Sequence, residues 1–271
     1  TPSPGLDEAA QYLVQQWRAA GLVAPPSLPD HLQRFECGGP DHPGPASNVL
    51  ALLPGRDAEL SELVMVTAHY DHLGERTTGP DRIYNGANDN ASGTAAMLAV
   101  AEVLAAAPPR RSVLFIAFCG EERGLRGSTY YAEHPVRPLD DVVAHVNLEM
   151  LGRPGPAEPP TAWIPGRARS ELGDWLSAAT PESEVRFVDG YAIGPEEGAA
   201  FDRSDNYPLA LHGVVAHTVA SGPLDALYHS PLDQAERLDY PRMARLVQAI
   251  ARGVYRLAEH PGRPGWIDPP P

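Results

Sequence analysis

The chain contains no lysine, and its charge is strongly negative. All 21 basic residues are arginines, against 35 aspartates and glutamates, so the formal net charge is −14. A field of one sign repels the phosphate backbone of nucleic acids. We therefore expect no nucleic-acid partner.

Cysteines and long apolar runs are also scarce. Cys37 and Cys119 are the two cysteines, too few for a fold held together by disulfides. Cys119 ends the apolar run 112–119, which predicts a buried free thiol. No apolar stretch approaches the roughly 20 residues of a membrane span, so none is expected.

The sequence leaves the cellular compartment and the oligomeric state open. The chain begins at Thr1 rather than Met, which fits a removed leader as well as a shortened sequence. A secreted or periplasmic location is slightly favoured over the cytoplasm.

What the chain does have is apolar sequence in a regular alternation. Apolar residues make up 43% of it, enough for a sizeable core. Strands predicted as continuous apolar runs alternate with amphipathic helices, which is typical of a sheet covered by helices. The predicted helices are 7–20, 91–107, 125–133, 168–179, 204–211 and 241–259; the predicted strands are 48–53, 63–68, 112–119, 142–148, 184–188 and 214–220.

The fold class expected from this alternation is α/β. We predict a single three-layer sandwich whose central β-sheet is mixed, mainly parallel and covered by helices on both faces. No repeat and no shift in composition marks a boundary, so residues 1–271 are read as one domain with a Pro-rich tail from about 261.

Metal-binding side chains follow the predicted strands. His69 and Asp71 come after one strand, Glu121 and Glu122 after another, and Glu149 after a third. Ligands bind to sheets of this type where strands end. Carboxylates gathered at one edge repel one another unless a cation neutralises them. Zinc accepts imidazole nitrogen and carboxylate oxygen together, so a zinc site is predicted here.

Two further residues complete the pattern. Asp89 opens a predicted helix, and His229 lies in the loop after the strand 214–220. A lone histidine or a Glu-Glu pair is usually a surface feature, and His72 and His217 have no assigned role. Ligand-type side chains at five separate positions are harder to explain by structure alone.

Taken together, the motifs resemble the co-catalytic zinc peptidases of the bacterial leucyl aminopeptidase type, family twenty-eight of clan MH. The resemblance covers about residues 7 to 258. The motifs that carry it are Ala68-His69-Tyr-Asp71-His-Leu-Gly74, Gly86-Ala-x-Asp89-Asn-x-Ser-Gly93, Phe118-x-Gly-Glu121-Glu122, Asn147-Leu-Glu149-Met-x-Gly152 and Tyr228-His229-Ser-Pro231.

The resemblance implies two zinc ions per chain that are bridged by Asp89. His69 and Glu149 would complete one site, and Glu122 and His229 the other. It also implies a cis peptide bond between Asp89 and Asn90.

The resemblance further implies the catalytic roles in hydrolysis of a peptide substrate. Glu121 would be the general base, taking a proton from a metal-bridging water and passing it to the leaving amine. Asp71 would fix the ring of His69, and Tyr228 would donate a hydrogen bond to the developing oxyanion. The implied activity is that of an aminopeptidase, which removes the N-terminal residue of a peptide.

Two positions depart from the family pattern. Glu149 stands where relatives often have Asp, which leaves the geometry and filling of that metal site open. Ser204-Asp205-Asn206 stands where relatives often read Ser-Asp-His, which leaves specificity open.

Other functions of the same fold stay in view. A carboxypeptidase needs a cation for the terminal carboxylate, and Arg203 lies near the expected pocket. A glutaminyl cyclase, a transferase, would work with one zinc, and a non-catalytic binding relative would lack ligands that are all present here. A related family with an inserted dimerisation domain does not fit, because predicted helices and strands already fill the segment Glu149–His229.

Features outside this pattern give less information about function. Gly-x-Ser-x-Gly and His-Glu-x-x-His are both absent from the chain, which disfavours a serine hydrolase and the metalloproteases built on that zinc motif. Glu196 and Glu197 are read as part of a solvated loop, although their charge would add to the acidity of the pocket.

Overall fold

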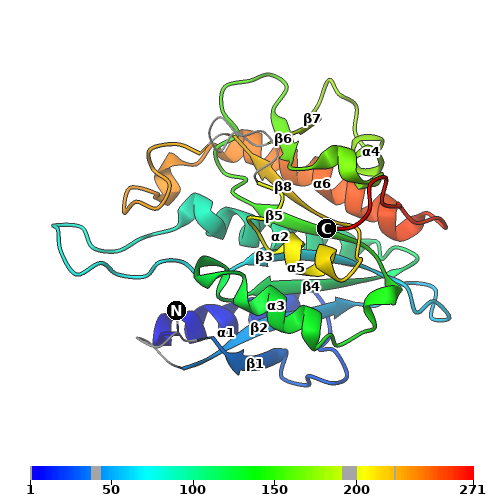
Figure 1. Ribbon diagram of the computed structural model, residues 1–271, viewed down its shortest axis with the longest axis horizontal. Helices are drawn as coiled ribbons and strands as arrows, with labels where there is room; N and C mark the ends of the chain where they lie inside the picture. Colours follow the sequence, from blue (N-terminus) through cyan, green and yellow to red (C-terminus); the bar gives the residue numbers. More distant parts are fainter. Residues whose placement is uncertain (1, 38–43, 191–199, 223) are drawn as a thin grey trace.

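One mixed sheet of eight strands runs through the protein (Figure 1). The computed structural model describes residues 2–37, 44–190, 200–222 and 224–271. The strands lie side by side in the order β1 (Leu32–Glu36), β2 (Pro45–Leu53), β4 (Ser112–Phe118), β3 (Leu63–His69), β5 (Val142–Glu149), β8 (Ala216–Ser221), β6 (Thr161–Ile164) and β7 (Arg186–Asp189).

The strands at the centre of the sheet are parallel. Strands β4, β3, β5 and β8 all run in one direction. Strand β2 joins β4 antiparallel on one side, and β6 joins β8 antiparallel on the other. The carboxyl ends of the four central strands therefore meet at one edge of the sheet, as predicted.

Helices cover both faces of this sheet. Helices α1 (Pro4–Ala19), α2 (Gly93–Ala106), α4 (Leu172–Ser177) and α6 (Tyr240–Glu259) pack on one face, and α3 (Arg126–Glu133) and α5 (Asn206–Leu211) on the other (Figure 1). Side chains of β3 alternate between the two layers, with Val64 and Val66 on the first face and Leu63 and Met65 on the second. Every residue of β3 is buried, which explains its uninterrupted apolar sequence. The predicted three-layer sandwich is confirmed.

The two longest helices carry clear start signals. The Ser3 side chain accepts a hydrogen bond from the N–H of Leu6, and the Asp239 side chain accepts one from the N–H of Arg242. A proline follows each cap, where its missing N–H costs nothing. The buried face of α6 includes Leu246, Ile250 and Val254, so this helix closes one layer of the core.

Two strands and one helix differ from the prediction. Strands β1 and β6 were not predicted: β1 is a half-exposed edge strand, and β6 has only four residues. The helix predicted over 168–179 is regular only from Leu172 to Ser177. Ser170 is extended and pairs with Trp266 of the C-terminal tail, which prevents the helix from starting earlier.

Both cysteines are free and buried, as predicted for Cys119, and their Sγ atoms lie 4.0 Å apart. None of the helices in the described ranges is long and apolar enough to cross a membrane.

Candidate metal centre

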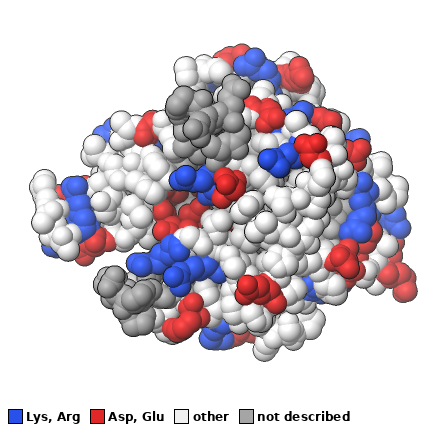
Figure 2. All heavy atoms as spheres, viewed as in Figure 1, with Lys and Arg blue, Asp and Glu red and all other residues white. Residues whose placement is uncertain are grey.

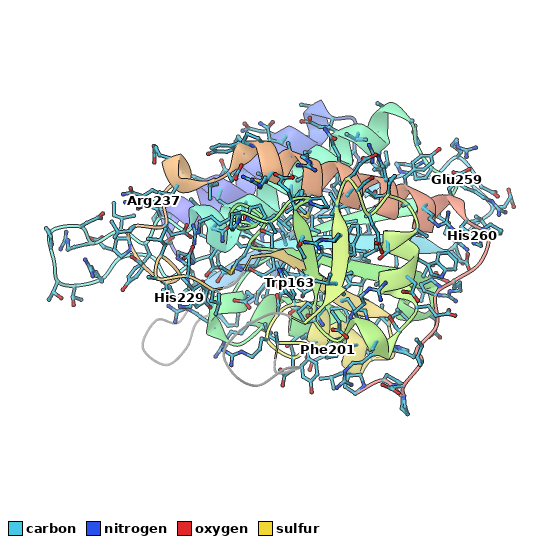
Figure 3. All side chains as sticks on the ribbon, turned by 90° about the horizontal axis from the view of Figure 1, so that it is seen from above. Trp163, Phe201, His229, Arg237, Glu259 and His260 are labelled. Atoms are coloured by element: carbon cyan, nitrogen blue, oxygen red, sulfur yellow. The ribbon has the colours of Figure 1, made fainter. Side chains whose placement is uncertain are left out.

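The strand ends bring the predicted ligands to one edge of the sheet. His69 is the last residue of β3, Glu149 is the last of β5, and Glu121 and Glu122 follow β4. His229 lies in the loop after β8, at the opposite end of the molecule from His260 in Figure 3. In Figure 2, acidic side chains gather in a hollow of the surface with arginines near its rim.

Asp89 is held in an irregular turn between Gly86 and helix α2. The peptide bond between Asp89 and Asn90 is cis, as the resemblance implied. The Asn90 side chain ties this turn to the end of β5, since it accepts hydrogen bonds from the N–H groups of Gly93 and Met150 and donates one to the Leu148 carbonyl. A Cβ atom at Gly93 would lie 2.5 Å from that carbonyl oxygen, so the close approach requires glycine.

Asp233 supports the same turn through hydrogen bonds to its backbone. Its carboxylate accepts hydrogen bonds from the backbone N–H groups of Asn88 and Asp89, at 3.0 Å each. Asp233 is fully buried and is paired with Arg153, which also binds Asp225. The turn that presents Asp89 is thus fixed at its backbone, and the Asp89 side chain is left to face the strand ends.

The two oxygens of Asp89 face two different groups of side chains. Oδ1 lies 3.3 Å from His69 Nε2, which is 3.2 Å from Glu149 Oε1. Oδ2 lies 3.1 Å from His229 Nε2, which is 3.2 Å from Glu122 Oε2. One carboxylate therefore joins both groups.

These spacings fit zinc. Zinc bonds of about 2.0–2.2 Å at tetrahedral angles place neighbouring ligand atoms about 3.3–3.5 Å apart. The four distances from His69 and His229 are close to that value. Asp89 Oδ2 and His229 Nε2 are both buried, and neither has a hydrogen-bond partner in the described part of the chain. Two lone-pair donors facing each other in this way suit a cation between them.

His72 approaches the second group in a different manner. Its Nδ1 lies only 2.7 Å from Glu122 Oε1 and 3.9 Å from Asp89 Oδ2. A separation of 2.7 Å is too short for two ligands of one ion and normal for a charge-assisted hydrogen bond. His72 therefore orients Glu122, a contact that the sequence reading missed.

Glu121 lies beside the first group. It offers an oxygen within 4.8 Å of the ligand atoms of His69 and Glu149. Burial raises the pKa of the Glu121 carboxyl well above its ordinary value, the charges of Glu149 and Asp205 raise it further, and His69 opposes the shift. A carboxyl with a raised pKa is suited to exchange protons near neutral pH.

The excess of negative charge extends to neighbouring groups. Burial raises the pKa of Glu149, and raises that of Asp205 to about 7. Burial opposes protonation of His69, but the charges of Glu149 and Glu121 outweigh it and hold the His69 pKa well above its ordinary value. Without a cation, these groups are stabilised only by taking up protons.

Asp71 contacts both His69 and Glu121. The carbonyl oxygen of Asp71 is 3.1 Å from His69 Nδ1, and its carboxylate oxygen Oδ1 is 3.7 Å from the same atom. That Oδ1 also accepts a hydrogen bond from the N–H of Glu121, at 3.2 Å. The ring of His69 is thus oriented mainly by the Asp71 backbone, and the carboxylate links the two strand ends.

A buried hydrogen-bond chain fixes Glu149. The Ser204 hydroxyl donates to Glu149 Oε2 at 2.9 Å, and Asn147 Nδ2 donates to the Ser204 oxygen at 2.8 Å. Asn206, at the position where relatives often have His, accepts a hydrogen bond from Thr218 and donates to the Phe201 carbonyl. The Ser204-Asp205-Asn206 segment therefore braces the site, a role that the sequence reading left open.

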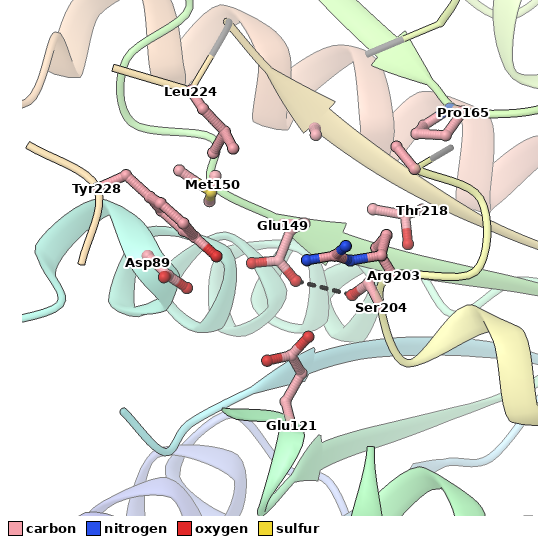
Figure 4. Close-up of a pocket in the computed structure, with 12 residues that line it drawn as sticks. Asp89, Glu121, Glu149, Met150, Pro165, Arg203, Ser204, Thr218, Leu224 and Tyr228 are labelled. Carbon is pink, nitrogen blue, oxygen red and sulfur yellow. Dashed lines mark hydrogen bonds between the residues drawn. The ribbon is translucent and has the colours of Figure 1, made fainter. Parts of the chain in front are cut away.

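A cavity of about 100 Å³ adjoins the first group (Figure 4). In Figure 4 the carboxylates of Glu121 and Glu149 and the hydroxyl of Tyr228 point toward the same space. The Tyr228 ring stacks on His229 with centroids 3.8 Å apart. The cavity is lined by Asp89, Glu121, Glu149, Met150, Pro165, Ala200, Arg203, Ser204, Thr218, Ala220, Leu224 and Tyr228.

All eight predicted site residues come together here. The contacts of Asp233, Ser204 and His72 were not foreseen, and nothing in the sequence distinguishes Asp233 from a surface aspartate. Glu196 and Glu197 lie outside the described residues.

Comparison with known proteins identifies the family. Residues 48–254 match the model of peptidase family M28. The chain belongs to this family. It is 27% identical over 236 residues to the aminopeptidase YwaD of Bacillus subtilis, covering 82% of this chain and 47% of YwaD. This M28 chain thus spans about half the length of that relative.

Solved structures show the same fold at lower identity. A Zn-dependent exopeptidase from Parabacteroides distasonis superposes with a TM-score of 0.74 at 17% identity, covering 94% of this M28 chain and 91% of its own. A glutaminyl cyclase from Porphyromonas gingivalis gives 0.73 at 17% identity, with 93% and 90% covered. Because both identities are low, these likenesses concern the fold alone.

Proposed function

We propose that this M28 protein is a zinc-dependent exopeptidase with two zinc ions per chain, and specifically an aminopeptidase. The observation that carries the proposal is the placement of Asp89, whose two oxygens face two histidine–glutamate groups at zinc-ligand spacing. Family membership and the likeness to the aminopeptidase YwaD support it. The single sheet through the described residues supports one catalytic domain.

In this proposal His69, Asp89 and Glu149 hold one ion, and Asp89, Glu122 and His229 hold the other. When bound, zinc polarises a carbonyl group and lowers the pKa of water from 15.7 to about 7. His72 and Ser204 keep Glu122 and Glu149 in place through their hydrogen bonds.

Glu121 serves as the general base. Its carboxylate takes a proton from the attacking water as the oxygen adds to the scissile carbonyl carbon. The same carboxyl then gives that proton to the leaving nitrogen when the C–N bond breaks, so Glu121 ends the cycle ionised again. Tyr228, whose hydroxyl points into the cavity (Figure 4), donates a hydrogen bond to the developing oxyanion.

The acidic lining of the cavity favours a substrate with a free α-ammonium group. Glu121 and Glu149 both line it, and the charge of Asp205 is near enough to raise the pKa of Glu121. Such a group is attracted by carboxylates that are largely desolvated.

The test compares leucine p-nitroanilide with the same compound acetylated at its nitrogen. An aminopeptidase cleaves leucine p-nitroanilide and does not cleave the acetylated compound. Equal rates would contradict the proposal, and cleavage only of substrates with a free C-terminus would indicate a carboxypeptidase that uses Arg203, which lines the cavity.

Glutaminyl cyclisation is the second candidate, because the Porphyromonas gingivalis cyclase shows that this fold can host it. It would need one zinc and would release ammonia from a substrate with N-terminal glutamine. Zinc content distinguishes the two activities, and so does the product formed from glutaminyl p-nitroanilide. An aminopeptidase releases p-nitroaniline, and a cyclase releases ammonia.

A further inference from the structure

Arg203 is the one basic residue among the described residues that line the cavity beside the metal centre. In Figure 4 its guanidinium extends into the space between Glu149 and Thr218. The side chain is exposed, and it forms no ion pair with a carboxylate of the described residues. Among the described lining residues, Arg203 thus places a guanidinium in a pocket whose other charged side chains are acidic.

The neighbouring residue fixes how far Arg203 lies from the reacting centre. Ser204 donates its hydrogen bond to Glu149 at 2.9 Å, and consecutive Cα atoms are about 3.8 Å apart. The backbone of Arg203 therefore lies close to the carboxylate at which a substrate's α-ammonium is expected. An arginine side chain at that position reaches substrate groups that are only a few bonds away from the ammonium.

The rest of the cavity wall offers no other charged partner for a substrate side chain. Beyond the carboxylates and Arg203, the described lining consists of apolar side chains such as Met150, Pro165 and Leu224 and of the hydroxyl-bearing Ser204, Thr218 and Tyr228. A substrate side chain that enters this part of the cavity meets apolar walls, neutral hydroxyls and one planar guanidinium. The guanidinium fork binds a carboxylate through two parallel hydrogen bonds.

We propose that Arg203 binds a carboxylate of the substrate and makes this enzyme prefer peptides with N-terminal glutamate or aspartate. The inference rests on the proposed aminopeptidase function and extends it to a substrate class. The same carboxylate chemistry is offered by the free C-terminus of a very short peptide, so the experiment separates a side-chain carboxylate from a terminal one.

The test measures kcat/KM of the wild type, Arg203→Leu and Arg203→Lys on glutamyl and leucyl p-nitroanilide. The wild type should favour the glutamyl substrate. Arg203→Leu should lower the glutamyl-to-leucyl ratio by about 10- to 100-fold, since a charge-assisted hydrogen bond is lost. Arg203→Lys keeps the charge but not the guanidinium fork, so its glutamyl-to-leucyl ratio should lie between those of the wild type and Arg203→Leu. Arg186→Leu is the matched control, because Arg186 is an exposed arginine on β7 outside the cavity.

A second pair of substrates, Leu-Gly and Leu-Gly amide, tests the terminal carboxylate. If Arg203→Leu changes only this ratio, Arg203 binds the C-terminus of dipeptides and the acidic preference is wrong. If both ratios stay the same as in the wild type, the proposal as a whole is overturned.

Binding gives a readout that does not depend on turnover. Calorimetric titration with L-glutamate and L-leucine should show tighter binding of glutamate to the wild type and no such preference in Arg203→Leu. Glutamate preference without cleavage of any free-amine substrate would support the Arg203 site and reject the aminopeptidase function. Cleavage of free-amine substrates with no glutamate preference in either assay would support the aminopeptidase function and reject the Arg203 site.

Discussion

Asp233 lies directly behind Asp89 and accepts the backbone N–H of that residue at 3.0 Å. Asp233 itself is fully buried, and its charge is paired with Arg153. An aspartate with no expected role thus holds the backbone of the residue that both metal groups share.

Asp233→Asn should weaken zinc binding by about 10- to 100-fold, as loss of outer support commonly does. The amide replaces one acceptor oxygen with a donor, which opposes the N–H groups of Asn88 and Asp89 in one orientation, and Arg153 and the N–H of Asn88 in the other. It also removes one of the two carboxylates that pair with Arg153, which should lower the free energy of unfolding by about 1–3 kcal/mol. Competition for zinc with a chromophoric chelator measures the first effect, and urea unfolding the second.

Asp225→Asn is the matched control for this substitution. Asp225 also binds Arg153 but makes no hydrogen bond to the Asp89 turn. The control should keep near-normal zinc affinity. If the two variants bind zinc equally well, Asp233 does not position Asp89.

The adjacent glutamates should separate into a base and a ligand. Glu121→Gln should keep its zinc and lose turnover by about 10²- to 10⁴-fold, because an amide cannot carry the proton. Glu122→Gln should lose zinc, since an amide lacks the charge of the carboxylate that faces His229 and His72. Metal content by atomic emission and kcat are measured on both proteins. Equal loss of metal in the two variants would reject the assignment.

Removing metal should lower both activity and thermal stability. Asp89, Glu122 and Glu149 then face one another without a neutralising cation, and a ligand that binds only the folded state stabilises it by mass action. Thermal unfolding after chelation, then with added zinc at rising concentration, should show a fall in Tm and its recovery. A Tm that does not respond to zinc would argue against a metal centre at these residues.

Acid should destabilise the protein through buried histidines away from the metal centre. Burial lowers the pKa of His217 to about 4 and that of His145 to about 3, from an ordinary value of 6.5. Both are neutral in the folded state, whereas the unfolded chain takes up protons below about pH 6.5. The stability that these two neutral histidines contribute therefore falls as pH drops from 6.5 toward 4, by about 1.4 kcal/mol per pH unit for each histidine. In the metal-free protein the raised pKa values of Glu121, Glu149, Asp205 and His69 act in the opposite direction, so the effect is measured as a difference between variants.

Urea unfolding at pH 7 and pH 5 checks this expectation. It is run with chelator at both values, so that the empty metal centre contributes equally to the wild type and to each variant. His217→Gln should show a smaller drop than the wild type, and the exposed His212→Gln should show the same drop. An unchanged drop in His217→Gln would mean that this histidine does not contribute.

The metal centre could be predicted from sequence because its residues directly follow strands. His69 and Glu149 end apolar runs that are buried on both faces, and such runs are visible without a structure. The central strands and the long helices were predictable for the same reason. Strand β6 has four residues and gains its register only from β7 and β8, so its local sequence carries little signal.

Supporting contacts were less accessible because they join distant segments. Asp233 meets Asn88 across 145 residues, and Ser204 meets Glu149 across 55. No spacing rule connects such pairs. His72 lies inside a predicted motif, directly after Asp71, yet only the folded chain reveals which carboxylate it contacts.

The position of Asp89 has a thermodynamic consequence for the two-zinc centre that we propose. A carboxylate that binds two ions cannot shift toward one ion without changing its contact with the other. Whatever factor the first zinc imposes on the affinity of the second, the second must impose on the first. Loading and emptying are then coupled events, and the two affinities cannot be assigned to separate sites.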